Sequence, residues 1–187
     1  MTALLSFNAV TLRRGGRVLF EGLDLALNAG ELLHVTGPNG SGKSSLIRLA
    51  AGLLRAENGR VERSPLALAD DALALDRELS LSRALKFWDV NIDLALDAFG
   101  LAHLRQVPVR LLSSGQAKRA TLARVAASGA ALWLLDEPLN ALDADGAQRL
   151  ADLIDRHLGS GGAVLAASHQ ALAGESRRLE LGQGSTT

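Results

Sequence analysis

The sequence contains no cysteine, and this absence removes several classes of chemistry. It excludes disulfides, thiolate metal sites and a cysteine nucleophile, and it agrees with a reducing compartment. An excess of charge of one sign is also missing, because Lys plus Arg and Asp plus Glu number 20 each. A chain with no net charge has no strong field to attract nucleic acid. We therefore expect no nucleic-acid partner, and any anion to be bound by a local site.

Long hydrophobic runs and an export signal are absent as well. The longest apolar stretches, such as residues 130–135, are far shorter than the roughly 20 residues that span a bilayer. The first residues, MTALLSFNAVTLRR, place their charges after the apolar residues, which is the reverse of a secretory signal. The length of 187 residues suits one domain. We expect a single domain over residues 1–187 with no membrane span of its own, which reaches a membrane only through a partner.

Apolar patterns along the chain predict alternating strands and helices, an order that is typical of a parallel sheet. Between residues 80 and 104 the apolar residues recur every three or four positions, which predicts a helical insert within about residues 75–125. This apolar face packs either in the core or against a partner. The other expected elements are strands over 5–12, 23–28 and 31–36, a helix over 43–51, a helix over 115–127, a strand over 131–135, a helix over 146–158 and a strand over 163–167.

A glycine-rich segment carries the most specific motif. Gly37, Gly42, Lys43 and Ser44 match the pattern G-x-x-x-x-G-K-[ST], after a predicted strand and at the start of a predicted helix. Its backbone N–H groups can converge on a β-phosphate at the positive end of the helix dipole. Lys43 would reach the β- and γ-phosphates, and the Ser44 hydroxyl would bind Mg²⁺. A plain glycine turn is the alternative. The predicted ATP-binding residues are Gly37, Pro38, Asn39, Gly40, Ser41, Gly42, Lys43, Ser44 and Ser45.

Two adjacent acidic residues follow an apolar segment later in the chain. Asp136 and Glu137 come directly after residues 131–135, which are all apolar. Buried strands of a parallel sheet have this composition, and their carboxyl ends open onto the ligand crevice. We expect Asp136 to bind Mg²⁺ together with Ser44, and Glu137 to activate the attacking water. A solvated acidic loop is the alternative interpretation.

The segment LSSGQ closely resembles the LSGGQ signature of the ATP-binding cassette (ABC) family. The resemblance implies that this segment binds the γ-phosphate of ATP held by an opposite subunit, so that a homodimer completes the site. It also implies that Asp143, in LNALD, belongs to the loop that couples the two sites, and that His169, in AASHQ, is a catalytic switch histidine facing the γ-phosphate. The signature residues are Leu112, Ser113, Ser114, Gly115 and Gln116.

The fold that this family resemblance implies is α/β. It is a P-loop NTPase of the ABC ATPase type, with an N-terminal antiparallel β subdomain, a mostly parallel sheet core and a helical insert.

Within the ABC family, the chain is most similar to the ATP-binding export subunits of cytochrome c maturation, which are described as haem exporter subunits. Segments that carry the likeness include RVLFEGLDLALNAGEL, KFW, VPVRLLSSGQAKRATLAR and ALWLLDEP. The resemblance implies an ATPase that drives a translocase, with integral membrane permease subunits of the maturation system as partners. It also implies a peripheral position on the cytoplasmic face of the bacterial inner membrane. A different cargo, or a regulatory cassette with slow turnover, remains open.

The sequence departs from the family pattern at two places. Ala72 occupies the position where the family carries a glutamine that contacts Mg²⁺ and water, so we expect turnover to be slow or differently coupled to transport. Asp70 or Asp71 could take over that contact. Arg13 and Arg14 occupy the position of an aromatic residue that stacks on adenine in many cassettes. Because arginine can also stack on a base, adenine selectivity is left open.

Overall fold

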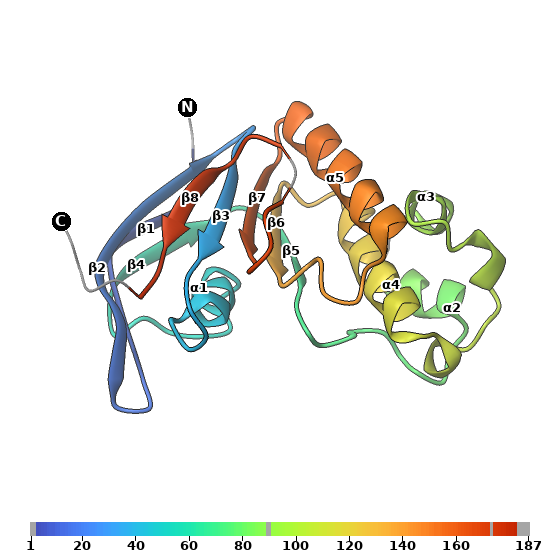
Figure 1. Ribbon diagram of the computed structural model, residues 1–187, viewed down its shortest axis with the longest axis horizontal. Coiled ribbons are helices and arrows are strands. Elements are labelled where there is room, and N and C mark those ends of the chain that lie inside the picture. The colour runs from blue at the N-terminus through green and yellow to red at the C-terminus, as the bar shows by residue number, and fades with distance from the viewer. Residues whose placement is uncertain (1–2, 89–90, 173, 183–187) are drawn as a thin grey trace.

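The computed structural model describes residues 3–88, 91–172 and 174–182, and these form two sheets flanked by helices (Figure 1). A three-stranded antiparallel sheet has the order β2-β1-β4, and a five-stranded parallel sheet has the order β5-β6-β7-β3-β8. The strands are β1 (Ala3–Arg14), β2 (Arg17–Asn28), β3 (Leu32–Thr36), β4 (Asn58–Arg63), β5 (Leu66–Ala69), β6 (Leu132–Asp136), β7 (Ala163–Ala167) and β8 (Arg177–Glu180).

The parallel sheet is apolar because both of its faces are covered. Every residue of β6 and β7 is buried, as expected for central strands of a parallel sheet. Leu132 and Leu134 pack toward one core, with side chains of β1, β3 and α1 (Lys43–Ala50). Trp133 and Leu135 point the opposite way, into a second core that includes side chains from the remaining helices. One strand therefore joins the two halves of the molecule.

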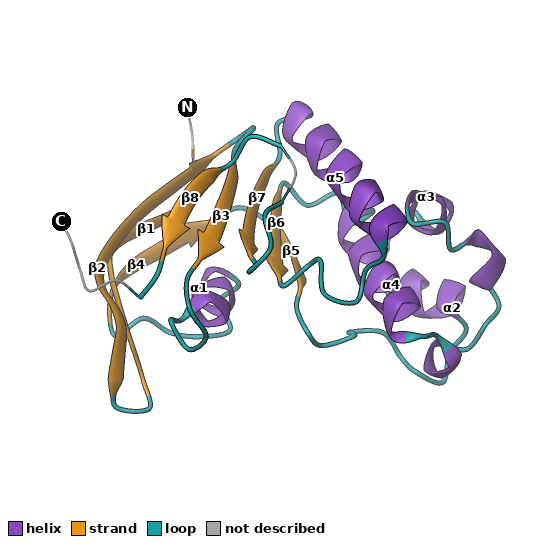
Figure 2. Cartoon of the chain, in the orientation of Figure 1, coloured by secondary structure: helices purple, strands orange, loops and turns teal. Residues whose placement is uncertain are grey.

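The helices gather mainly on the side of the parallel sheet that faces away from the antiparallel sheet (Figure 2). Helix α1 lies apart from them and begins at Lys43, within the phosphate-loop motif. Within the described ranges, no helix is both long and apolar enough to cross a membrane. The remaining helices are α2 (Leu81–Lys86), α3 (Ile92–Ala98), the short 3₁₀ turns η1 (Ala102–Leu104) and η2 (Val109–Leu111), α4 (Ser114–Ala126) and α5 (Ala144–Gly159).

The sequence patterns located the long elements and missed three strands. Strands β4 and β8 are largely polar and mostly exposed, so apolar alternation does not reveal them. Strand β5 has only four residues and is held by parallel pairing with β6. The periodic segment over residues 80–104 forms short helices rather than a single one, and residues 89–90 within it lie outside the described part. Of the periodic residues, Trp88 is 41% exposed and the others pack inward, while the neighbouring Phe87 is 81% exposed.

Candidate active site

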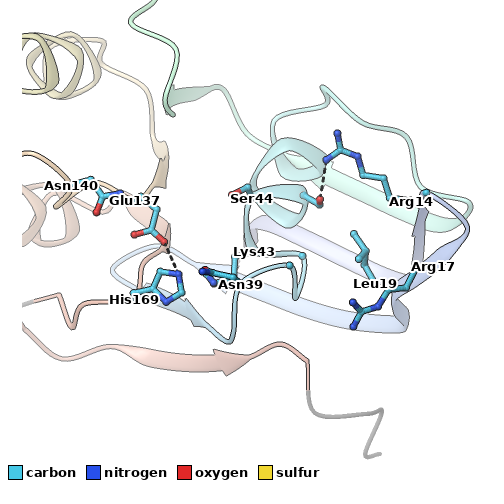
Figure 3. A pocket seen from close by; sticks show the side chains of 13 residues that line it. Arg14, Arg17, Leu19, Asn39, Lys43, Ser44, Glu137, Asn140 and His169 are labelled. Carbon is cyan, nitrogen blue, oxygen red and sulfur yellow. Dashed lines mark hydrogen bonds and ion pairs between the residues drawn. The ribbon is translucent and has the colours of Figure 1, made fainter. Parts of the chain in front are cut away.

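Residues of the predicted phosphate loop line a cavity with a volume of about 770 Å³. The cavity extends from the β1–β2 hairpin, past the start of α1, to the loops that follow β6 and β7 (Figure 3). Elements far apart in the sequence therefore share one site. Its lining residues are Arg14, Gly15, Arg17, Leu19, Asn39, Gly40, Gly42, Lys43, Ser44, Ser45, Glu137, Asn140 and His169.

Glycine is required at both ends of the phosphate loop. Gly37 has a φ of 142°, and a Cβ at this position would lie 2.3 Å from the main-chain oxygen of Leu181. Gly42 has a φ of 106° and precedes the first turn of α1. These backbone angles disfavour L side chains. Lys43 Nζ donates to the main-chain oxygens of Gly37 at 2.8 Å and of Pro38 at 3.2 Å, which holds the ammonium group over the loop.

The predicted metal ligands lie next to each other, although 92 positions separate them in the sequence. The Ser44 hydroxyl donates a hydrogen bond of 3.1 Å to Asp136 Oδ1. Burial raises the pKa of Asp136, while this hydrogen bond opposes the shift and nearby Asp71 and Glu137 add to it. A buried carboxylate next to a hydroxyl is an oxygen donor set that suits Mg²⁺. Among the described residues, no cluster of three or more His, Cys, Asp or Glu side chains could hold a metal without the nucleotide.

Glu137 is held in an unusual backbone conformation at the end of β6. Its φ is 45°, in the left-handed region that residues other than glycine seldom occupy. The Glu137 N–H donates to the main-chain oxygen of Ala167 at 2.8 Å, which ties it to β7. Glu137 Oε1 and His169 Nε2 are 3.6 Å apart. Strained residues of this kind concentrate at functional sites, and here the strain accompanies a carboxylate that faces the cavity (Figure 3).

His169 is positioned by a buried contact that the motifs did not reveal. His34, in β3, is only 3% exposed, and its Nε2 lies 3.0 Å from the main-chain oxygen of Ser168. Ser168 directly precedes His169, and its hydroxyl accepts a hydrogen bond from the N–H of Gln170 at 3.1 Å. These contacts secure the turn that presents His169 to the cavity. The sequence signal that could have identified His34 was its position as a polar residue inside an otherwise apolar strand.

The signature segment lies outside the large cavity. Ser113 caps α4 by accepting a hydrogen bond from the N–H of Gln116, whose side chain bonds back to the N–H of Ser113. Ser113, Gly115 and Gln116 line a separate cavity of about 310 Å³, together with Asp143. Ser114 opens α4, and Leu112 packs against the second core. Within one chain, the signature and the phosphate loop are therefore not brought together.

Asp143 connects this second cavity to the rest of the fold. Its carboxylate caps α5 by accepting a hydrogen bond of 2.9 Å from the N–H of Gly146, and it pairs with Arg119 of α4. These hydrogen bonds, the one from Gly146 first, lower the pKa of Asp143. Arg119 also pairs with Asp145 at 3.0 Å. Helix α4 and Asp143, the residue predicted to couple the two sites, are consequently joined by charged contacts.

Sequence reasoning missed Lys118. This residue lies on α4, and its Nζ donates to the main-chain oxygen of Asp136 at 3.4 Å. Burial lowers the pKa of Lys118, while the nearby carboxylates, Asp71 first, oppose the shift. Ala72, which the sequence is expected to place at the family's glutamine position, is exposed, and its N–H donates to Asp70 Oδ1 at 3.0 Å.

The family of the chain follows from its similarity to known proteins. The ABC transporter family model matches residues 20–140. The chain is 54% identical over 181 residues to the cytochrome c biogenesis ATP-binding export protein CcmA of Sphingopyxis alaskensis, covering 92% of this chain and 93% of that protein. It is 57% identical over 168 residues to the protein of the same name from Novosphingobium aromaticivorans, covering 88% and 87%.

Solved structures agree on the fold. The structure of the ATP-binding subunit of an ABC transporter has a TM-score of 0.81 at 19% identity, covering 89% of this chain and 79% of that one. A putative ABC transporter ATP-binding protein from Pyrococcus furiosus has a TM-score of 0.80 at 21% identity, covering 95% and 96%. The predicted α/β fold of the P-loop ABC type, with its antiparallel and parallel sheets, is confirmed. The chain belongs to the ABC transporter family as an ATP-binding subunit, and ATP hydrolysis is the general activity of that family.

Proposed function

We propose that this chain is the ATP-hydrolysing subunit of a transporter complex that serves cytochrome c biogenesis, with haem or a haem-carrying complex as its cargo. The observation that carries the proposal is identity of 54% to a protein named for this process, over nearly the whole length of both chains. ABC ATPase subunits in general dimerise and work with a membrane permease. We place this subunit peripherally, on the cytoplasmic face of a bacterial inner membrane.

The phosphate loop would hold the triphosphate. Its N–H groups and the start of α1 favour the β-phosphate, and Lys43 would exchange its contacts with the loop oxygens for the β- and γ-phosphates. Ser44 and Asp136 would hold Mg²⁺, which when bound neutralises charge on the phosphate oxygens. Such an ion would also favour the ionised form of Asp136 against the effect of burial.

Glu137 and His169 would carry out the proton and charge chemistry of hydrolysis. Glu137 would accept a proton from water as the water oxygen bonds to the γ-phosphorus. The bond from that phosphorus to the β–γ bridging oxygen breaks, and ADP and inorganic phosphate are released. His169, which is 3.6 Å from Glu137, would orient this carboxylate and contact the γ-phosphate. The strained backbone of Glu137 aims the carboxylate at the same cavity.

The remaining parts of the ATP site would come from a second copy of the chain. Ser113, Gly115 and Gln116 lie at the start of a capped helix, which suits binding of a phosphate group. Because they line a different cavity from Lys43, they would act on the nucleotide of the opposite subunit. Asp143 would transmit the state of one site to the other through Arg119 and α4.

A genetic experiment tests the proposed function. Deletion of the gene should abolish membrane c-type cytochromes, detected by haem staining of gels, and the wild-type gene should restore them. The Glu137→Gln variant should be produced at the wild-type level and fail to restore them. Normal c-type cytochromes in the deletion strain would overturn the biogenesis assignment while leaving ATP hydrolysis untouched.

A regulatory cassette that turns over slowly is a second candidate, favoured by Ala72 at the glutamine position. Single-turnover hydrolysis with purified complex decides between the two. A first turnover much slower than the transport cycle would support the regulatory role.

A further inference from the structure

Strand β3 carries a buried histidine that does not line the nucleotide cavity. His34 lies between strands β7 and β8, in register with Ala166 and Arg178 (Figure 1). Its neighbours Leu33 and Val35 point into the core shared with α1, so alternation along the strand places the His34 ring on the opposite face of the sheet. A buried polar side chain needs a hydrogen-bond partner, and this ring finds one just beyond the end of β7.

The partner of His34 is the main-chain oxygen of Ser168, which lies 3.0 Å from Nε2. A carbonyl oxygen only accepts hydrogen bonds, so Nε2 carries a proton and donates it. In its neutral form, His34 is therefore the tautomer with its proton on Nε2.

This contact completes the hydrogen-bond ladder between β3 and β7. The last main-chain bond of the ladder runs from the Ser168 N–H to the Val35 oxygen at 3.3 Å. In a parallel pair the Gly37 N–H would be the next donor, to the Ser168 oxygen. The chain turns into the phosphate loop at this point, with a φ of 142° at Gly37, and that bond is not formed in the described structure. Because Ser168 is fully buried, the His34 side chain supplies the donor that the main chain does not.

The segment that His34 holds carries contacts of both groups assigned to hydrolysis. Ala167 precedes Ser168, and its oxygen accepts the hydrogen bond of 2.8 Å from the Glu137 N–H. His169 follows Ser168, and its Nε2 lies 3.6 Å from Glu137 Oε1. The His169 side chain is half exposed, so packing alone does not fix its ring. A rotation of the peptide between Ser168 and His169 would therefore move this ring relative to Glu137 (Figure 3).

We propose that His34 is a positioning residue for ATP hydrolysis. By donating to the Ser168 oxygen, it fixes the turn that orients His169 against Glu137. This inference rests on the proposed hydrolytic function and on the roles given there to these two residues. His34 acts through the main chain and does not contact the nucleotide, so the phosphate loop and Lys43 keep their contacts without it.

Two substitutions of His34 test the need for a donor, in steady-state hydrolysis by the purified complex. His34→Leu has a similar volume and no donor, whereas His34→Gln keeps an N–H donor at about the reach of Nε2. His34→Leu should lower kcat by about 10- to 100-fold, the loss expected when catalytic groups are misplaced. Its KM should stay within about twofold of the wild-type value, since binding groups are untouched. His34→Gln should retain kcat within about threefold.

Leu33→Val is the matched control on the same strand. Leu33 is 1% exposed and packs into the core on the other side of the sheet. Loss of a buried methylene there should lower the midpoint of urea unfolding and leave kcat unchanged. This comparison separates a weakened strand from a lost donor.

Nuclear magnetic resonance of the full chain with isotope-labelled histidine measures the contact without hydrolysis. The chain has four histidines, and the ring signal that disappears in both His34 variants identifies His34. This signal should show a proton on Nε2. The ring signals of His169 should shift in His34→Leu and return to their wild-type positions in His34→Gln.

The possible outcomes separate this inference from the proposed function. Wild-type kcat in His34→Leu, equal losses in the Leu and Gln variants, or a His34 proton on Nδ1 alone would each overturn the positioning role and leave the ATPase assignment intact. A wild-type complex that does not hydrolyse ATP would reject the proposed function, and the inference with it. If His34→Leu fails to fold, His34→Met replaces it, because methionine also has no N–H donor, and the wild-type spectrum still tests the proton on Nε2.

Discussion

Lys118 Nζ on helix α4 donates a hydrogen bond to the main-chain oxygen of Asp136, at 3.4 Å. Helix α4 begins at the signature segment, and Asp136 ends the strand that supplies the acidic pair. The contact therefore joins the part of the chain that faces one cavity to the part that builds the other. A hydrogen bond from a charged donor is worth roughly 1.5–3 kcal/mol, so its loss would be measurable.

Replacing Lys118 with Met should lower ATP turnover without changing nucleotide affinity. If loss of this hydrogen bond raises the activation free energy by about 1.5 kcal/mol, the reaction becomes roughly tenfold slower. Steady-state hydrolysis and calorimetry on the same preparation measure the two effects. Lys86→Met is the control, because Lys86 is exposed at the end of α2. Equal losses of affinity and turnover would point to general disruption of the fold instead.

Glu137→Gln should retain ATP binding and lose hydrolysis, because the amide cannot accept the proton of the attacking water. General-base catalysis contributes about 10²- to 10⁴-fold, which is the expected fall in turnover. The bound ATP should then hold two subunits together, seen as a dimer by size-exclusion chromatography with ATP and Mg²⁺. Undiminished turnover in the purified complex would contradict the role given to Glu137.

Lys43→Ala should weaken ATP binding on the order of 100-fold, since the ammonium is the charged side chain of the loop that would contact two phosphates. Isothermal titration calorimetry measures the change, and Lys86→Ala provides a control with the same loss of charge. Thermal unfolding should show that both variants remain folded. An unaltered dissociation constant for Lys43→Ala would reject the phosphate-loop interpretation.

His157 should make the protein less stable in mild acid. Its ring stacks on Trp133 with centroids 3.9 Å apart, its Nε2 has no hydrogen-bond partner in the described structure, and burial lowers its pKa. Between that lowered pKa and about 6.5, the unfolded chain binds more protons than the folded one, so stability falls as pH falls. The midpoint of urea unfolding should therefore drop as pH is lowered from 8 toward 5.

The variant His157→Phe isolates this effect, because phenylalanine keeps the stacking on Trp133 and does not titrate. Its urea midpoint should fall less over the same pH range than that of the wild type. Asp136, whose pKa is raised by burial, shifts stability in the opposite direction, and it is present in both proteins. His103→Gln, at an exposed position, should behave like the wild type. Identical pH profiles for His157→Phe and wild type would exclude His157 as the source.

Much of the fold could be predicted because local signals identify its central elements. The apolar residues 131–135 predicted β6 to within one residue, and the strand over 163–167 coincides with β7. The sequence patterns did not predict strands β4 and β8, because these lie at sheet edges and have polar, mostly exposed side chains. Their strand character comes from pairing with β1 and β3, which no local pattern encodes.

The sequence by itself determined the parts of the site that depend on consecutive residues. The glycines of the phosphate loop, Lys43 at the helix start and the Asp136–Glu137 pair are local motifs, because a turn, a helix end and a strand end are each built within a few positions. Tertiary structure decided what depends on distance through space. It placed Asp136 beside Ser44 and turned Arg14 toward the cavity while Arg13 pairs with Glu57.

Tertiary structure also decided that the predicted signature and the phosphate loop of one chain line different cavities. Ser113 and Gln116 occupy the start of α4, and packing of that helix against α3 and α5 leaves them at a different cavity from Lys43. The order of the motifs along the chain does not give the distance between them in space, because the sheet and its covering helices set where each motif lies. The hydrogen bond from Lys118 to Asp136 also depends on tertiary structure, because it forms only once α4 has docked beside β6.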